Sequence, residues 1–433
     1  MVSRQVRRLA EAGLLAAAFL LGSVVYTHTR MRLRFWASKQ KGVPFGPHRE
    51  PPPPEKRSMS ELFESLKKVP FNPSWVSGGL KAVTGNSFLL FMNAARATSG
   101  VAYPYPPEFE EVVIESFDGT PVTAAVGIHR DGRRRPAIVM SHGFMGSKHD
   151  HYIIDPLLVA YAEWGFNVLG IDLRNFGRSQ RLSHSPTTAG WKEAEDLLAA
   201  ARYLSEQPEV TSVGIVGFSM GAGSTMRAAF ANREYPYLTG GAIAWNGYAD
   251  SGRMIEYIST RPKLTDLFFP VYLGFRLMHK IRREDMKGYI DDPEQRRYLD
   301  GGFGLADFAT YVEKIAAPHY GVSTEEYYRN SSPREFLADV EVPLLVVHAE
   351  DDPVCPASEM NELEGVVRDN PNVKIWMLPT GSHCLFQYLD RDWYDTVMRD
   401  FFTYWAAWDE ALPPGVETDD VELNVEEKPA PVE

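Results

Sequence analysis

This chain of 433 residues has few cysteines, and its basic residues are outnumbered by its acidic ones. It has two cysteines, so at most one disulfide can form within it. Lys and Arg number 45 against 57 Asp and Glu, a formal net charge of -12. Because phosphate binding needs a basic face, this balance argues against nucleic acid as the main partner. No internal repeat is apparent, and 44% hydrophobic residues suffice for a large core. We expect one α/β domain with appendages.

The N-terminal residues are basic and surround a single apolar run, Ala12 to Tyr26. This run has about the length of the apolar part of a signal peptide and is shorter than the ~20 residues of a spanning helix, although extension to Leu9 brings it close. No small-residue cleavage site follows it. We therefore predict an uncleaved membrane anchor over residues 1–36, with a cleaved signal peptide as the alternative. Positive residues flank both ends, so the side of the membrane stays open.

Two further segments differ in composition from the rest. Residues 37–100 are predicted to be a linker and helical region, with a proline run at Pro51 to Pro54 and a helical pattern at Met59 to Val69. Residues 410–433 are rich in Glu, Asp and Pro and poor in large apolar residues. This composition predicts a disordered acidic tail.

Strand and helix patterns alternate from Phe109 onward. Asp118 and Gly119 separate two strand-like segments, which predicts a hairpin. Continuous apolar runs follow, of the kind found in strands buried on both faces of a parallel sheet. These runs are Pro136 to Ser141, Phe166 to Leu173, Ser212 to Gly217, Gly240 to Trp245, Pro343 to His348 and Val373 to Leu378. Helical patterns lie between most of them, at Asp150 to Trp164, Ala189 to Gln207, Met220 to Arg233, Ala357 to Asp369 and Asp390 to Trp408.

This alternation predicts a doubly wound, mostly parallel sheet. The core is assigned to residues 101–247 and 340–409. One connection is unusually long, contains no convincing strand and is rich in aromatic residues. Long connections inside a compact domain are usually functional. We predict that residues 248–339 form a helical cap over the site, with an insertion that packs elsewhere as the alternative.

Ser219 lies in Gly217-Phe218-Ser219-Met220-Gly221, a G-x-S-x-G pattern. The pattern places a serine on a tight turn between a strand and a helix, with its hydroxyl clear of the backbone. Alone it is weak evidence, because glycine and serine are common. Here it follows an apolar strand and opens a helical segment rich in small residues, so we predict that Ser219 is a nucleophile.

A serine hydroxyl needs a neighbouring base, normally histidine, which a carboxylate then orients. Asp352 and His383 follow Ser219 in the chain, each just after a predicted strand. Carboxyl ends of parallel strands are where such sheets build their sites. We predict His383 as general base and Asp352 as its orienting acid. The competing acids are Glu350, Asp351 and Asp250.

Acyl transfer also requires donors for the developing oxyanion. The segment from Ser141 to Gly146 directly follows a predicted strand. We predict that the backbone N–H groups of Phe144 and Met220 form the oxyanion hole.

Together these motifs resemble the α/β-hydrolase superfamily, from about Phe109 to Trp408. The segment from Asp172 to Ser179 also resembles a D-x-R-x-x-G-x-S stretch that is largely structural in that family. Among subgroups, the chain is similar to membrane-associated esterases and to the acyl-esterase or peptidase branch. In these proteins the helix that precedes the serine turn starts with residues that resemble Gly190-Trp191 and Glu195-Asp196 of this chain. The resemblance implies a serine-dependent hydrolase without cofactor, acting on an ester, thioester or amide. Membership of the subgroups that carry an aspartate nucleophile at the turn between strand and helix is disfavoured, because Ser219 occupies that position.

No metal is expected, although His149 and His151 lie close in the sequence. The two cysteines, Cys355 and Cys384, follow Asp352 and His383 closely. They either form a disulfide that braces these loops or remain two separate thiols.

The favoured function is hydrolysis of a small-molecule or lipid-like ester through an acyl-enzyme on Ser219, with association to a membrane through the N-terminal segment. Four aromatic residues and one methionine of the cap favour long acyl chains, with a purely structural role in the core of the cap as the alternative; these residues are Phe268, Phe269, Tyr272, Phe275 and Met278. The alternatives are a peptidase or amidase, an acyltransferase, and a noncatalytic scaffold at the membrane.

Overall fold

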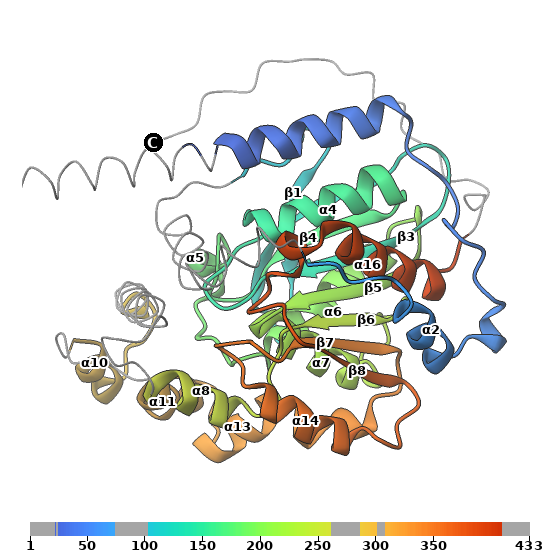
Figure 1. Cartoon of the computed structure of the whole chain (residues 1–433). Coiled ribbons are helices and arrows are strands. Elements are labelled where there is room, and N and C mark those ends of the chain that lie inside the picture. Colours follow the sequence, from blue (N-terminus) through green and yellow to red (C-terminus); the bar gives the residue numbers. More distant parts are fainter. Residues whose placement is uncertain (1–21, 23–24, 74–102, 261–285, 301–307, 409–433) are drawn as a thin grey trace, which may run out of the picture.

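The computed structural model describes residues 22, 25–73, 103–260, 286–300 and 308–408 (Figure 1). At its centre is a sheet of eight strands in the order β1-β2-β4-β3-β5-β6-β7-β8. The first two strands form the predicted antiparallel hairpin. Of the eight strands, β2 alone runs antiparallel to the others, and β3 to β8 are mutually parallel. Their bounds are β1 Glu110–Glu115, β2 Pro121–Gly127, β3 Arg135–Ser141, β4 Asn167–Asp172, β5 Val210–Phe218, β6 Ala242–Trp245, β7 Leu344–Ala349 and β8 Val373–Leu378.

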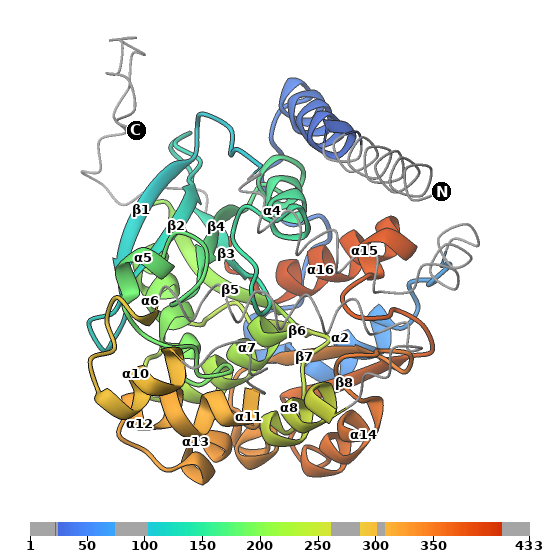
Figure 2. The same ribbon diagram turned by 90° about the vertical axis from the view of Figure 1, so that its left-hand side faces the viewer.

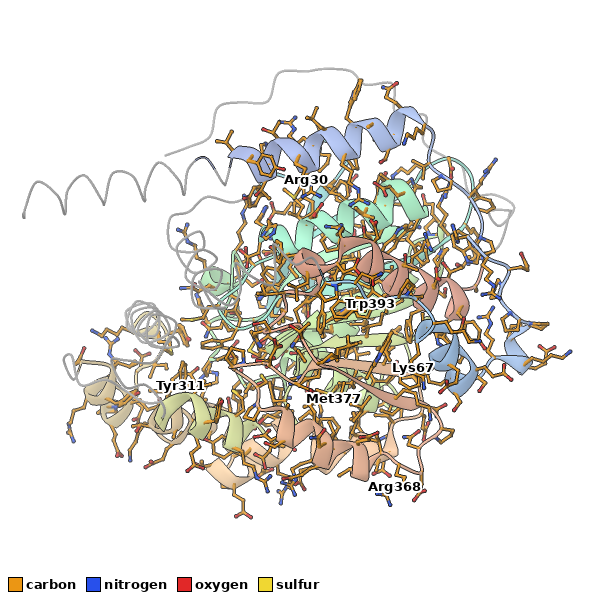
Figure 3. The ribbon with its side chains drawn as sticks, in the orientation of Figure 1. Arg30, Lys67, Tyr311, Arg368, Met377 and Trp393 are labelled. Carbon is orange, nitrogen blue, oxygen red and sulfur yellow. The ribbon has the colours of Figure 1, made fainter. Side chains whose placement is uncertain are left out.

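Helices cover both faces of the sheet, which confirms the doubly wound α/β prediction (Figure 1). One layer contains α2, α4 and α16, and Trp393 of α16 packs against Trp245 of β6 (Figure 3). The other layer contains α6, α7 and α14. The bounds are α2 Met59–Leu66, α4 His151–Trp164, α6 Glu193–Ser205, α7 Met220–Ala231, α14 Ala357–Val366 and α16 Arg391–Trp405, with short helices α5 Gln180–Ser183 and α15 Phe386–Leu389.

The helix predicted from Ala189 begins only at Glu193. Ala189 and Gly190 have φ of 50° and 97°, which no α-helix accommodates. The buried Glu193 carboxylate holds this turn by accepting hydrogen bonds from the Thr188 and Gly190 amides, at 2.8 and 3.0 Å. The sequence pattern missed the turn because alanine and a single glycine do not by themselves interrupt a helical pattern.

In its described part, the connection between β6 and β7 consists of helices joined by turns and lies at one end of the molecule (Figure 2). Ile255, Tyr311 and Tyr327 belong to a small apolar core within it. The side chains between Phe268 and Met278 that favour long acyl chains in the sequence analysis lie outside the described residues. The elements are α8 Ser251–Thr260, α10 Pro293–Asp300, α11 Phe308–Tyr311, η2 Val312–Ala316, α12 Ala317–His319, α13 Thr324–Ser331, η3 Pro333–Glu335 and η4 Leu337–Asp339. We refer to residues 248–339 as the cap.

A buried acid joins this cap to the core. Glu359, in the first turn of α14, accepts a hydrogen bond from the Asp250 amide at the start of the cap. Burial, together with the charge of Asp250, raises the pKa of Glu359 from 4.5 to about 7. The ionised carboxylate is therefore disfavoured at this junction.

We expect Glu359→Gln to stabilise the fold at alkaline pH. Below pH 4.5 the carboxyl is protonated in folded and unfolded chains, so it costs nothing. Above pH 7 it is ionised in both states, and only the folded state carries the cost of its burial. Thermal unfolding should show a gain of about 1–3 kcal/mol for the variant at pH 8 that shrinks towards pH 5. Glu364→Gln, an exposed residue of the same helix, should show no such trend.

The N-terminal region lies against the core. Residues 25–40 form a helix alongside α4 (Figure 1). The following segment crosses the core surface, where Arg57 Nη1 donates to the Trp405 carbonyl at 2.9 Å and the Asn72 amide donates to Asp390 at 2.6 Å. The described part of the predicted linker is thus packed rather than free. Among the helices that the structure describes, none has the length and apolar character to cross a membrane. Of the predicted anchor at residues 1–36, residues 22 and 25–36 are described, whereas the predicted acidic tail lies outside the described residues.

Candidate functional site

Ser219 lies at the turn from β5 into α7, with φ 55° and ψ -117°. A positive φ is costly for a residue with a side chain, so the neighbours must enforce it. A Cβ at Gly217 would overlap the Gly221 carbonyl, and one at Gly221 would come within 2.5 Å of the His142 carbonyl oxygen. Both glycines of the G-x-S-x-G pattern are therefore required by the close approach of the backbone.

The structure brings together the three predicted catalytic side chains. His383 Nε2 lies 2.8 Å from Ser219 Oγ, and its Nδ1 lies 2.9 Å from Asp352 Oδ2. With a proton on Nδ1 donated to the carboxylate, Nε2 can accept the serine hydroxyl hydrogen. The serine comes from the end of β5, the acid follows β7 and the histidine follows β8, so three loops at the carboxyl ends of the parallel strands supply the group.

Asp352 is fully enclosed and well supplied with donors. Its Oδ1 accepts from the amides of Val354 and Cys355, at 2.8 and 3.0 Å. Burial alone would raise the pKa of this carboxyl, but the adjacent His383 and its hydrogen bond lower the pKa below the ordinary aspartate value. Asp352 is thus held as a carboxylate that can stabilise an imidazolium.

The competing acids face elsewhere. Asp351 accepts from the amides of Gly381 and Ser382, at 3.0 and 2.7 Å, and so fixes the loop that carries His383. Glu350 is exposed. Asp250 pairs with Arg334 on the cap. Of the four acids considered from the sequence, Asp352 is the one that contacts the histidine.

Asn246 is a buried residue at this site that the sequence reasoning missed. It follows β6 with φ 51°, and its Nδ2 donates to Asp352 Oδ2 at 2.8 Å and to the Ser382 carbonyl at 2.7 Å. One side chain therefore ties the acid to the histidine loop. The available signal was its place directly after a buried strand, at the sheet edge where the other site residues lie.

We expect Asn246→Gly to lower kcat about tenfold with little change in KM. Glycine accepts φ 51° without strain, so only the side chain and its two hydrogen bonds are lost, a loss of about 1–3 kcal/mol. Asn175→Gly is the matched control, because Asn175 is also buried with a positive φ of 64°. Steady-state kinetics on folded protein would refute this positioning role if both variants lost kcat equally.

The predicted oxyanion residues lie on either side of Ser219. Met220 opens α7, and the first amides of a helix have no acceptor within it. A Cβ at Gly143, next to Phe144, would lie 2.9 Å from Ser219 Cβ, so this loop passes directly against the nucleophile. His142 fixes the loop: its Nε2 accepts the Leu173 amide at 3.1 Å, so its Nδ1 carries the hydrogen that is donated to the Gly143 carbonyl at 2.7 Å. Oxyanion binding by these amides stays a prediction.

A pocket opens beside Ser219 between the cap and the core. Its described lining has no acidic or basic side chain. The cap supplies one wall, which includes Tyr311 (Figure 3), and the core supplies the other. The lining residues are Phe144, Thr187, Ala189, Ser219, Met220, Tyr248, Met254, Ile255, Ile258, Phe308, Tyr311, Val312, Tyr327, Val354 and Cys355.

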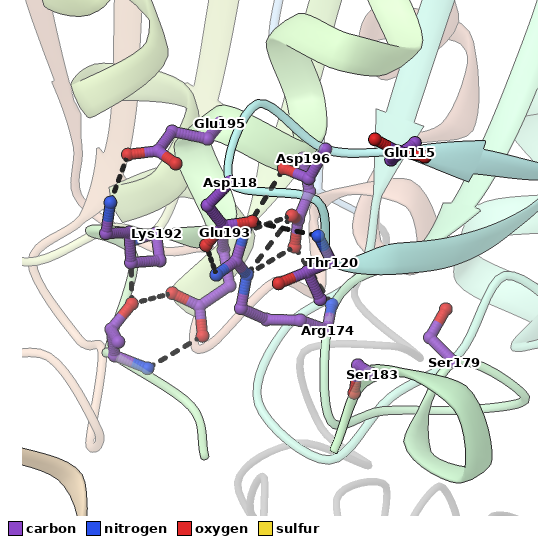
Figure 4. Close-up of polar contacts among 12 residues, drawn as sticks. Glu115, Asp118, Thr120, Arg174, Ser179, Ser183, Lys192, Glu193, Glu195 and Asp196 are labelled. Atoms are coloured by element: carbon purple, nitrogen blue, oxygen red, sulfur yellow. Dashed lines mark hydrogen bonds and ion pairs between the residues drawn. The ribbon is translucent and has the colours of Figure 1, made fainter. Parts of the chain in front are cut away.

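The D-x-R-x-x-G-x-S segment makes buried ion pairs instead of entering the pocket. Arg174 pairs with Asp196 of α6 and with Asp118 of the hairpin turn, both at 2.6 Å (Figure 4). Asp172 pairs with the buried Lys148 at 2.6 Å. These contacts tie the end of β4 to the hairpin and to α6, which is a structural role.

Neither histidine considered as a metal ligand is directed at the other. His149 Nδ1 contacts the Tyr103 carbonyl, and His151 contacts the Tyr388 hydroxyl. In the described part of the chain, the one cluster of potential ligands is Asp352, Cys355 and His383, two of which already bond each other. Both cysteines are free thiols, and burial raises the pKa of Cys355 well above its usual value.

Sequence comparison agrees with this architecture. A model described as the alpha/beta hydrolase family matches residues 138–394, more than half of the chain. The chain therefore belongs to the α/β-hydrolase family.

Several proteins are distantly similar over part of their length. An abhydrolase domain-containing protein of Dictyostelium discoideum is 24% identical over 58% of this chain and 62% of its own. The phospholipase ABHD3 of Mus musculus is 22% identical over 65% and 67%, and the monoacylglycerol lipase of Saccharomyces cerevisiae 20% over 58% and 54%. The chain thus spans less than two thirds of the first and third of these relatives. Among solved structures, the Pyrococcus furiosus esterase Pf2001 has a TM-score of 0.48 at 18% identity, covering 70% of this chain and 97% of its own.

Proposed function

We propose that this α/β hydrolase cleaves a carboxylic ester with an uncharged, apolar acyl group, through an acyl-enzyme on Ser219. The observation that carries the proposal is the Ser219–His383–Asp352 hydrogen-bonded chain at the wall of an apolar pocket. Two of the similar proteins are named as a phospholipase and a lipase, both of which act on esters.

In the proposed reaction His383 Nε2 takes the proton from Ser219 Oγ as the oxygen attacks the ester carbonyl. The negative charge that forms on the carbonyl oxygen is stabilised by the amides of Phe144 and Met220. Asp352 stabilises the imidazolium. The tetrahedral intermediate collapses, His383 returns its proton to the leaving alcohol, and the acyl group stays on Ser219. Water, deprotonated by His383, then releases the acid and restores the serine.

The pocket predicts which esters are used best. A charged group would lose its hydration among the described lining residues without gaining a partner, whereas each buried methylene contributes up to about 0.8 kcal/mol. We expect kcat/KM to rise with acyl length across a p-nitrophenyl ester panel until the pocket is full. The larger side chain of Ile258→Trp should lower turnover of long esters and spare the acetyl ester, which serves as the internal control. Equal loss for all esters would contradict this assignment of the acyl pocket.

The same panel separates the alternatives. Faster release from p-nitroanilides than from esters would indicate a peptidase or amidase. Product that carries an added alcohol in place of free acid would indicate an acyltransferase. Folded protein that turns over neither substrate class, and does not react with a fluorophosphonate, would indicate a noncatalytic scaffold.

We also infer that the protein associates with a membrane through its N-terminal segment. The apolar run from Ala12 to Tyr26 and the basic residues around it support this inference. Flotation of the full chain with vesicles tests it: recovery of the protein only in the dense fractions would contradict it.

A further inference from the structure

The helix formed by residues 25–40 exposes an unusual share of apolar surface. Of the seven exposed large hydrophobic side chains in the described part of the chain, four lie on it: Val25, Tyr26, Leu33 and Trp36, with exposed fractions of 56% to 66%. Leu33 comes seven residues after Tyr26, and Trp36 three after Leu33, so these spacings place them on one face. Isolated surface hydrophobics are ordinary, but a stripe along a helix is characteristic of a binding face.

The opposite face is fastened to the catalytic domain and cannot turn outward. Met31 is buried and Phe35 stacks on Tyr161 of α4. Arg34 makes a two-pronged contact with Glu163, at 2.7 and 2.8 Å. The outer stripe therefore keeps a fixed orientation relative to Ser219 and its pocket.

Cations border the stripe. Arg30, labelled in Figure 3, and Arg32 are exposed residues of the same helix, and Lys41 follows it. This basic surface stands out on a chain whose net charge is -12. Anionic headgroups are a complementary partner for it. The acidic C-terminal tail could neutralise the arginines, but it has few large apolar residues with which to cover Leu33 and Trp36.

We propose that the outer face of this helix lies in the interface of an anionic lipid bilayer, with the helix axis close to the membrane plane. Aromatic and leucine side chains with flanking arginines are the composition of such interfacial helices. An axis perpendicular to the membrane would leave Leu33 about 10 Å and Trp36 about 15 Å beyond Tyr26, in water, because each residue rises 1.5 Å. The in-plane arrangement buries both.

This inference refines the proposed membrane association and does not depend on the proposed hydrolase activity. It adds that the membrane contact is rigidly joined to the domain through Arg34 and Phe35. The pocket beside Ser219 would therefore keep one orientation relative to the lipid surface.

Depth measurement on the full chain tests the proposal. An environment-sensitive fluorophore is placed on Leu33→Cys, and on Val366→Cys of α14 in the opposite helix layer as control. Wild-type protein treated identically gives the background from Cys355 and Cys384. With vesicles of phosphatidylserine and phosphatidylcholine, we expect a blue shift and strong quenching by bromine-labelled acyl chains at position 33 only. Arg30→Gln and Arg32→Gln should each weaken vesicle binding about fivefold.

Three results would overturn the proposal. The label at position 33 could stay in water while the protein sediments with vesicles, which would indicate attachment by the apolar run alone. It could be shielded without lipid in a concentration-dependent way, which would indicate a second copy of the chain. It could be shielded without lipid at every concentration, which would indicate cover by another part of the same chain. Hydrolysis of a short soluble ester, assayed in the same samples, reports separately on the catalytic proposal.

Discussion

Ser219→Ala is expected to reduce ester hydrolysis by at least about 10³-fold while the protein stays folded. The substitution removes the one atom that would form the acyl-enzyme, and the other members of a catalytic triad cannot replace it. What remains should reflect binding and oxyanion stabilisation alone. Initial rates with the best ester of the panel measure the loss.

Ser224→Ala provides the matched control for this change. Ser224 is a buried serine of α7, one turn beyond the elbow, whose hydroxyl donates to the Met220 carbonyl at 2.9 Å. It should lose much less activity than Ser219→Ala. Equal activity of wild type and Ser219→Ala would refute the proposed nucleophile.

Asp352→Asn is expected to lower kcat by about 10⁴-fold with little change in fold. An amide in place of the carboxylate can donate a hydrogen bond to His383, which would favour the tautomer that carries its proton on Nε2 and so cannot accept from Ser219. It would also leave the imidazolium without a counter-charge. The loss should appear in kcat, because neither Asp352 nor His383 contributes to the apolar pocket wall that binds the acyl chain.

Asp351→Asn is the matched control for this change. The two aspartates are adjacent, yet Asp351 contacts the Gly381 and Ser382 amides and Asp352 contacts the imidazole. An asparagine oxygen can still accept at position 351, so we expect less than about a tenfold loss. A larger effect at 351 than at 352 would show that the acid has been misassigned.

The strands could be predicted from the sequence because each parallel strand is an uninterrupted apolar run. Val373 to Leu378 coincides with β8, and the other parallel strands differ from prediction by at most about two residues at an end. The helix before the elbow was the exception. Its first predicted turn is a loop stabilised by the buried Glu193 carboxylate, and such side-chain contacts leave no periodic signal.

Ser219, His383 and Asp352 could be predicted from the sequence for a related reason. Each follows an apolar run, and a doubly wound sheet brings the carboxyl ends of those runs to one edge. Asn246 also follows such a run, but an asparagine there has no sequence signature that separates a support for Asp352 from an ordinary turn residue. The pocket was still harder to predict from the sequence, because its walls combine cap and core residues more than a hundred positions apart.

The proposed reaction requires Ser219 to be an activated nucleophile. Its most direct test is the intact mass of the folded protein after reaction with a fluorophosphonate, followed by peptide mapping. We expect one adduct, on Ser219, that is absent from Ser219→Ala and forms far more slowly in Asp352→Asn than in Asp351→Asn. An adduct on another residue, or none on folded wild-type protein, would contradict it.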